Sequence, residues 1–232
     1  MKNNKLNLSI FLGFLFIVFL GIIYGNKISA SYNSLRIWSV ENLLWLGLGV
    51  PFLLLQSYVG IPNLLQPNIS NKLRFSQPFL IGIFFGVLDI LVIKIIQHPQ
   101  AYTELPPFLQ PFPYSIFLYF SGALEIEVFY RLIPITLMLL IGKKVSNGYY
   151  FNYFLWFAII TTSLREPIEQ LPSGENWYIA YALLSGFLMN YLQGIYYKNA
   201  GFISSLTLRL GHYLFWHILL GFYVQYFEIL KF

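Results

Sequence analysis

LNLSIFLGFLFIVFLGIIY, residues 6–24, is a run of 19 residues without a charged side chain. An α-helix needs about 20 mostly apolar residues to cross the hydrocarbon core of a bilayer. The basic segment MKNNK, residues 1–5, precedes the run, as in a secretory signal. The run is longer than the apolar core of about 7–15 residues in such signals. We therefore expect a retained membrane-spanning helix.

The rest of the chain continues this pattern. Of the 232 residues, 57% are hydrophobic and 10% are charged, whereas about a quarter of the residues in soluble domains are charged. Six further apolar runs lie at residues 40–59, 79–96, 114–141, 149–164, 177–197 and 202–227. The sequence predicts an all-α fold, a polytopic transmembrane helical bundle of about seven spans (six to eight). We expect residues 1–232 to form a single integral membrane domain.

Basic residues indicate the orientation, because short cytoplasmic loops carry an excess of Lys and Arg. With the amino terminus inside, seven basic residues lie on the inner side and four on the outer side. The inner residues are Lys2, Lys5, Lys72, Arg74, Lys143, Lys144 and Lys198, and the outer residues are Lys27, Arg36, Arg165 and Lys231. We expect a multi-pass protein, of the cell membrane, with a cytoplasmic amino terminus and membrane lipids as partners.

Composition also excludes several classes of function. The chain has no cysteine, which excludes disulfides, thiolate metal sites and cysteine nucleophiles. Its net charge of +5 is scattered along the chain, whereas a nucleic-acid surface needs a clustered basic face. No nucleic acid partner is expected.

Ionisable residues inside apolar runs are candidates for a functional site, because each costs about 2.5–3.5 kcal/mol to insert into a membrane. Asp89 and Lys94 lie near the outer end of the third run, where local neutralisation or snorkelling accounts for them. The others are Glu125, Glu127, Arg131, Arg209, His212 and His217.

The fourth run contains the segment ALEIEVFYRLIP, residues 123–134. Glu127 and Arg131 are four residues apart, so a helix would place them on one face and allow an ion pair. Glu125 lies roughly 200° around the helix from Glu127 and cannot share that face. Pro134 disturbs the helix at the carbonyl of Tyr130, and broken helices in membranes mainly line protein cavities. A cavity is therefore expected beside this segment.

In the last run, Arg209, His212 and Trp216 share a helix face at steps of three and four residues. An interhelical polar contact is the simplest interpretation of this face. His217 lies about 140° from His212 and points elsewhere.

These motifs resemble those of the CPBP intramembrane proteases, a family that includes CAAX prenyl endopeptidases and bacteriocin self-immunity proteins. Residues 126–131 resemble the family's EExxxR motif, with Glu127 on its second Glu and Arg131 on its Arg. His212 corresponds to the His of the family's last motif, and the similarity covers roughly residues 114–223. The resemblance implies a helical membrane bundle in which Glu and His residues activate water for peptide hydrolysis.

Three positions depart from the family pattern. Ile126 stands where the motif has its first Glu, although Glu125 is adjacent. Thr161 stands where the FxxxH motif has its His, and Trp216 stands where the last motif has Asn or Asp.

We therefore expect a CPBP-like intramembrane peptidase, or a non-proteolytic derivative, that acts on a membrane-associated peptide or protein. Glu125 or Glu127 with His212 would activate water, which makes these three the catalytic candidates. Arg131, Arg165 and Arg209 are the substrate-binding candidates, because a guanidinium can hold a carboxylate or an oxyanion.

No cofactor is expected, and no metal either. His212 and His217 lack the spacing of four residues that helical zinc sites use. Two alternatives stay open: a catalytically inactive binding or scaffold protein, and a small transporter. The transporter is the less favoured, because the sequence shows no inverted repeat.

Overall fold

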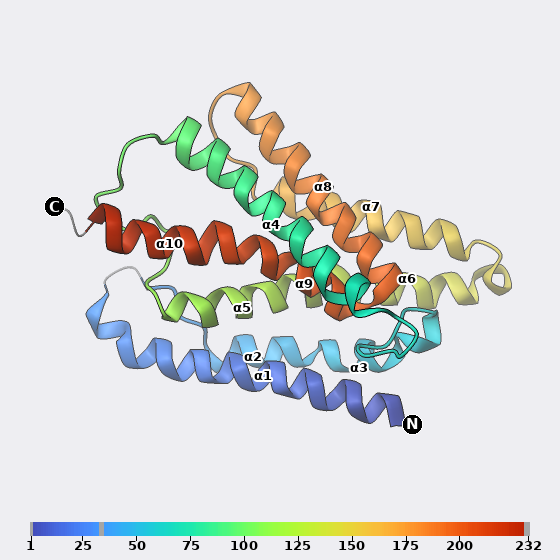
Figure 1. The fold of residues 1–232 in the computed structure, drawn as a ribbon. Coiled ribbons are helices and arrows are strands. Elements are labelled where there is room, and N and C mark those ends of the chain that lie inside the picture. The colour runs from blue at the N-terminus through green and yellow to red at the C-terminus, as the bar shows by residue number, and fades with distance from the viewer. Residues whose placement is uncertain (1, 33–34, 230–232) are drawn as a thin grey trace.

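The helices of the computed structural model follow the apolar runs of the sequence (Figure 1). The structure describes residues 2–32 and 35–229, and this part of the chain contains helices, turns and loops but no strand. The predicted all-α class is therefore confirmed. Lys231, one of the basic residues used to predict orientation, lies outside the described residues.

Several apolar runs are divided into consecutive helical segments. The first half of the chain contains α1 (Lys2–Ile28), η1 (Ser29–Ser31), α2 (Val40–Gly47), α3 (Gly49–Leu55), η2 (Ser57–Val59), η3 (Lys72–Ser76), α4 (Gln77–Asp89) and η4 (Ile90–Gln97). The middle contains α5 (Tyr114–Glu127), η5 (Val128–Leu132), α6 (Ile133–Lys144), η6 (Val145–Gly148) and α7 (Phe151–Glu169). The last part contains α8 (Asn176–Ala200), α9 (Phe202–Tyr213), η7 (Leu214–Leu219), α10 (Leu220–Tyr223) and η8 (Val224–Glu228).

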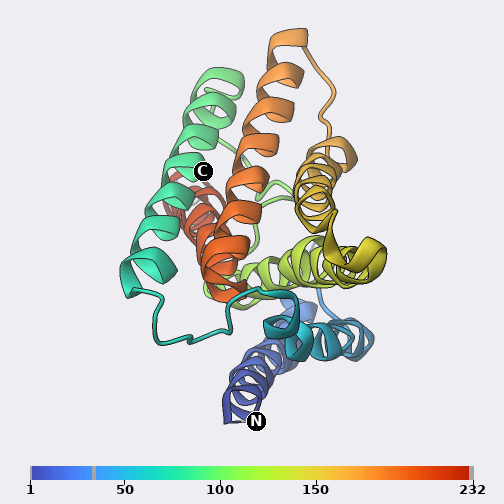
Figure 2. The same cartoon turned by 90° about the vertical axis from the view of Figure 1, so that its right-hand side faces the viewer.

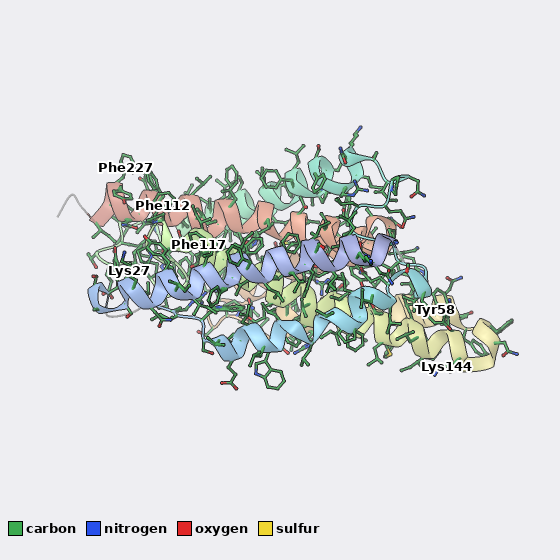
Figure 3. All side chains as sticks on the ribbon, turned by 90° about the horizontal axis from the view of Figure 1, so that it is seen from below. Lys27, Tyr58, Phe112, Phe117, Lys144 and Phe227 are labelled. Carbon is green, nitrogen blue, oxygen red and sulfur yellow. The ribbon has the colours of Figure 1, made fainter. Side chains whose placement is uncertain are left out.

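The chain runs back and forth between two ends of an elongated bundle (Figure 1). Lys27, Phe112 and Phe227 lie near one end, whereas Tyr58 and Lys144 lie near the other (Figure 3). The chain begins at the end marked by Tyr58 and Lys144, which we call the amino-terminal end. Segments 60–71 and 145–150 connect helices there, and segments 98–113 and 170–175 connect helices toward the opposite end.

The helices form two groups on either side of α5 and α9. Helices α1, α2 and α3 lie together along one side, and α1 contacts α5 while α3 contacts α6 (Figure 2). On the other side, α4 packs on α9 and α7 packs on α8. Residues that project from α5, α7, α8 and α9 toward the middle therefore converge.

Two glycines allow α4 and α9 to touch through their backbones. A Cβ atom on Gly82 would lie 2.0 Å from the carbonyl oxygen of Leu208, and one on Gly211 would lie 2.3 Å from that of Phe79. Neither position has room for a larger residue, as is common where membrane helices pack closely. This contact holds α4 directly against α9.

Judged by helix length and hydropathy, the structure does not reproduce the predicted seven membrane spans. Among the described residues, two helical stretches are long and apolar enough to cross a membrane, Asn4–Ser31 and Lys72–Gln97, and Val40–Leu55 is apolar but shorter. The other helices carry ionisable and amide side chains, which reduce mean hydropathy. Many of these side chains point inward, and mean hydropathy does not distinguish the inside of a helix from its outside.

Candidate functional site

A group of polar side chains fills the middle of the bundle, and we call it the polar network. Its members come from α5, η5, α7, α8 and α9, and each of them is buried. They are Glu127, Arg131, Glu166, Asn190, Gln193, Ser205 and Arg209. Buried charges are costly unless they are paired and hydrogen-bonded, so the partners of each charge determine what the network can do.

Arg209 is the centre of the polar network. Its Nη1 donates to Oε1 of Glu166 at 2.6 Å, and its Nη2 donates to Oε2 of Glu166 at 2.5 Å. The same Nη2 also donates to the side-chain oxygens of Asn190 at 3.0 Å and Gln193 at 2.9 Å. This bidentate geometry is typical of strong Arg–carboxylate pairs.

Glu127 is fully buried and committed to the same network. Its Oε1 accepts from Nε2 of Gln193 at 2.6 Å and lies 3.7 Å from Nε of Arg209. Its Oε2 accepts a hydrogen bond from the hydroxyl of Ser205.

The predicted ion pair between Glu127 and Arg131 is wrong, since no ion pair joins them in the described part of the chain. Arg131 instead donates to the backbone carbonyl of Tyr130 at 2.9 Å and to the side-chain oxygen of Asn190. Its Nη2 also lies 3.3 Å from the side-chain oxygen of Gln193.

Local helix geometry explains this difference. The π-helix η5 begins directly after Glu127, and a π turn is wider than the α turn on which the predicted spacing rested. In addition, Pro134 has no amide hydrogen for the carbonyl of Tyr130, and Arg131 supplies that carbonyl with a donor.

A cavity of about 470 Å³ lies beside the polar network. A cavity was predicted beside residues 123–134 because Pro134 interrupts the helix there. Its wall includes Arg36, Phe108, Gln170 and Tyr178, from segments toward the end opposite the amino terminus. Of the six predicted site residues, Glu125, Arg209 and His212 line it, whereas Glu127, Arg131 and Arg165 do not.

His212 forms a dyad with Asp89 in the cavity wall. Nε2 of His212 lies 2.7 Å from Oδ2 of Asp89, and the hydroxyl of Tyr181 donates to Oδ1 of Asp89 at 2.6 Å. A neutral imidazole that donates through Nε2 to an ionised carboxylate holds its lone pair on Nδ1. Nδ1 of His212 has no hydrogen-bond partner among the described residues.

Glu125 is the uncommitted carboxylate of the cavity. It is half-buried, it lines the same cavity as His212, and it has no hydrogen bond or ion pair within residues 2–32 and 35–229. The two acidic residues near the end of α5 thus have different surroundings, because both carboxylate oxygens of Glu127 accept hydrogen bonds.

Arg165 lies on the exposed side of α7. Its Nε donates to Oε1 of Glu169 at 2.8 Å, and Tyr130 donates to Oε2 of the same carboxylate. The hydrogen bonds from Tyr130 and Arg165 hold the pKa of Glu169 below its usual value. Arg165 therefore belongs to a surface pair.

The three positions that depart from the CPBP motifs have distinct surroundings. Thr161 is exposed and donates to the carbonyl of Phe157 at 2.8 Å, so no basic group reaches the cavity from this position. Trp216 lines the cavity and stacks on Phe108 with ring centroids 5.1 Å apart. Ile126 also lines the cavity, next to Glu125.

Sequence reasoning missed the roles of Glu166 and Asp89. The fifth apolar run was predicted to end at residue 164, with Arg165 on the outer side, but α7 continues through Glu166 to Glu169. A signal was present, since Leu155, Ile159, Thr162 and Glu166 repeat at the steps of three or four that mark a buried helix face. Asp89 was expected to be neutralised locally, and its distant partner His212 could not be inferred from spacing.

Two further results bear on the chemistry. Among residues 2–32 and 35–229, no three His, Asp or Glu side chains converge in a way that could hold a metal ion. Comparison of the chain with protein-family models, curated proteins and solved structures returns no match.

Proposed function

We propose that the chain is a single multi-pass membrane domain of seven spans. Its distribution of side chains supports this, because the charged polar network lies buried in the interior while many large apolar residues are exposed on the outside. Glu127 and Arg131 are fully buried, whereas Leu44 is 71% and Leu80 is 64% exposed. Soluble proteins rarely show contiguous apolar surfaces of this kind.

The distribution of basic residues supports a cytoplasmic amino terminus. Lys5, Lys72, Arg74, Lys143, Lys144 and Lys198 belong to segments at the amino-terminal end. Lys27, Arg36 and Arg165 belong to segments toward the opposite end. Since cytoplasmic loops carry the excess of basic residues, the cavity opens toward the extracytoplasmic side.

Within this frame, we propose that the protein is a CPBP-like peptidase that hydrolyses a membrane-associated peptide in the cavity. One observation carries the proposal: the free carboxylate of Glu125 and the Asp89–His212 dyad line the same cavity. A carboxylate and an oriented imidazole are the groups that general acid–base catalysis uses.

In this mechanism, Glu125 accepts a proton from water as the water oxygen bonds to the peptide carbonyl carbon. Asp89 and Tyr181 hold the imidazole of His212 in place in the wall of the same cavity, with its Nδ1 buried. Glu125 then gives the proton to the peptide nitrogen as the carbon–nitrogen bond breaks. Glu127 and Arg131 stabilise the helices that carry these groups.

The test uses purified protein in lipid vesicles and a membrane-associated peptide substrate, with cleavage followed by mass spectrometry. Removing a general acid or base typically lowers a rate by about 10²- to 10⁴-fold. Glu125→Gln and His212→Ala should each cause a loss of that size in a folded protein. Glu41→Gln is the matched control, because Glu41 is exposed on α2 and does not line the cavity. Cleavage that survives both cavity variants contradicts hydrolysis by these groups.

A second candidate is a protein that binds the same peptide without cleaving it. The exposed Thr161 and the apolar Trp216 favour it, because the resemblance would place polar motif residues there. A cellular phenotype that persists in the double variant Glu125→Gln, His212→Ala would support binding and contradict hydrolysis.

A further inference from the structure

Arg36 is the exception among the five arginines of the chain. Arg74, Arg131, Arg165 and Arg209 each donate guanidinium hydrogen bonds to carbonyl, amide or carboxylate oxygens. The guanidinium of Arg36 has neither a hydrogen bond nor an ion pair in the part of the chain that the structure describes. It lies 5.8 Å from the ring centroid of Tyr119, in the wall of the cavity.

The backbone of Arg36 is held in place at the entrance of the cavity. Its amide donates to Oε1 of Gln110 at 2.9 Å, and its carbonyl accepts from the hydroxyl of Tyr114 at 2.7 Å. Tyr114 is the first residue of α5, so Arg36 lies at the extracytoplasmic end of this helix. A fixed backbone presents the guanidinium at a defined place.

The charges of the cavity change from its entrance to its interior. Glu125 lies eleven residues from the start of α5, about 16 Å along its axis. Of the acidic residues in the wall, Asp89 already binds His212 and Glu166 already binds Arg209. The free carboxylate of Glu125 would repel an anionic group from the interior, and Arg36 would attract it. An anionic group is therefore expected at the entrance of the cavity, beside Arg36.

We propose that Arg36 binds a carboxylate of the peptide that occupies the cavity. This inference rests on the proposed function, since it takes a peptide as the ligand. A planar guanidinium matches a carboxylate through two parallel hydrogen bonds. Tyr178 and Gln170 line the same cavity and carry polar groups of the kind that can bind a peptide backbone.

The carboxylate site can be tested without knowing the natural peptide. The chain has no cysteine, so Ser185→Cys places one thiol in the cavity wall. Iodoacetate and iodoacetamide alkylate this thiolate in the same way, through a new bond from sulfur to the methylene carbon and loss of iodide. The two reagents have similar sizes, but only iodoacetate carries a carboxylate. The ratio of their rates, measured on the full chain in detergent, reports on binding of a carboxylate in the cavity.

Arg36→Gln in the Ser185→Cys protein should lower the iodoacetate to iodoacetamide ratio about threefold to fivefold, the size expected for a partly exposed ion pair. Arg36→Lys should keep most of the ratio, and high salt should reduce the difference. Arg165→Gln is the matched control, because this arginine faces the surface and already binds Glu169. An unchanged ratio in Arg36→Gln, or an equal loss in Arg165→Gln, overturns the proposal.

A second measurement identifies the source of the carboxylate. Three alanine tetrapeptides compete with alkylation by iodoacetamide: one with a free carboxyl terminus, one amidated, and one amidated with an aspartate side chain. We expect at least one anionic peptide to slow alkylation, and we expect this protection to be lost in Arg36→Gln. Stronger protection by the free carboxyl terminus would show that Arg36 binds a chain end, whereas stronger protection by the aspartate peptide would show that it binds a side chain. Protection by the neutral peptide alone, or by none, contradicts the inference. An Arg36 effect on the alkylation ratio together with no peptide cleavage would refute hydrolysis and leave the anion site intact.

Discussion

Arg209 and Glu166 join α9 to α7 through two parallel hydrogen bonds of 2.6 and 2.5 Å. Both side chains are buried, and the same guanidinium contacts Asn190 and Gln193 of α8. One side chain thus holds three helices together. We expect this ion pair to determine which helices meet, because any other packing would leave unpaired charges in the interior.

Arg209→Met should destabilise the protein strongly. Removing one partner of a buried pair costs about 3–5 kcal/mol, because the remaining charge is left uncompensated. The double variant with Glu166→Gln should recover part of that loss. The thermal midpoint of the protein in detergent measures the effect.

Arg165→Met is the matched control for this change. Arg165 and Glu169 form an exposed pair on the same helix, and such pairs contribute at most about 1 kcal/mol. Strictly additive losses from Arg209→Met and Glu166→Gln would show that the two side chains do not stabilise each other.

Glu127→Gln and Glu125→Gln should differ in stability although the residues are two positions apart. The side-chain amide introduced at position 127 has one accepting oxygen and a nitrogen that only donates, so one of the hydrogen bonds from Gln193 and Ser205 is lost and a loss of about 1–3 kcal/mol is expected. Glu125 has no partner in the described chain, so its variant should stay within about 0.5 kcal/mol of the original. Equal thermal midpoints for the two variants would contradict the described network.

Gly82→Ala should disrupt the contact between α4 and α9. The new methyl group would meet the carbonyl of Leu208, and overpacking typically costs about 1–3 kcal/mol. Gly13→Ala is the control, since nothing lies within 4 Å of a Cβ there. Alanine in that exposed part of α1 should be neutral or stabilising by up to about 1 kcal/mol. Similar thermal midpoints for the two variants would refute close packing at Gly82.

Single cysteines at Asn147 and Ser173 should be labelled from opposite sides of the membrane. A membrane-impermeant maleimide should reach Asn147→Cys in inverted vesicles and Ser173→Cys in right-side-out vesicles. The chain has no native cysteine to give a background signal. Labelling of both from one side would exclude the proposed seven-span topology.

The periodicity of the sequence predicted most helices, because long apolar runs leave few alternatives to a helix. The break at Leu48 between α2 and α3 was not predicted, and neither was the continuation of α7 through Pro167. A charged, proline-containing segment is typical of a loop, but Glu166 gains a buried partner only if the helix continues.

For the site, Arg209, His212 and Trp216 all line the cavity, but so does His217, which was predicted to point elsewhere. Trp216 and His217 lie in the π-helix η7, which begins directly after Tyr213, so α-helical spacing does not fix their directions. The pairing of Glu127 with Arg131 failed because η5 is a π turn. Contacts between helices, such as that of Asp89 with His212, depend on tertiary packing and leave no local pattern.

The two carboxylates and two guanidiniums of the polar network sum to zero charge when all four are ionised. A transmembrane voltage acts on charge, at about 2.3 kcal/mol for each unit moved across 100 mV. If the chain spans a membrane as proposed, a balanced set feels almost no net electrical force, and voltage does little to displace the helices that carry it. Removal of a single member would leave an unbalanced charge in the core and make the packing of α7, α8 and α9 sensitive to voltage.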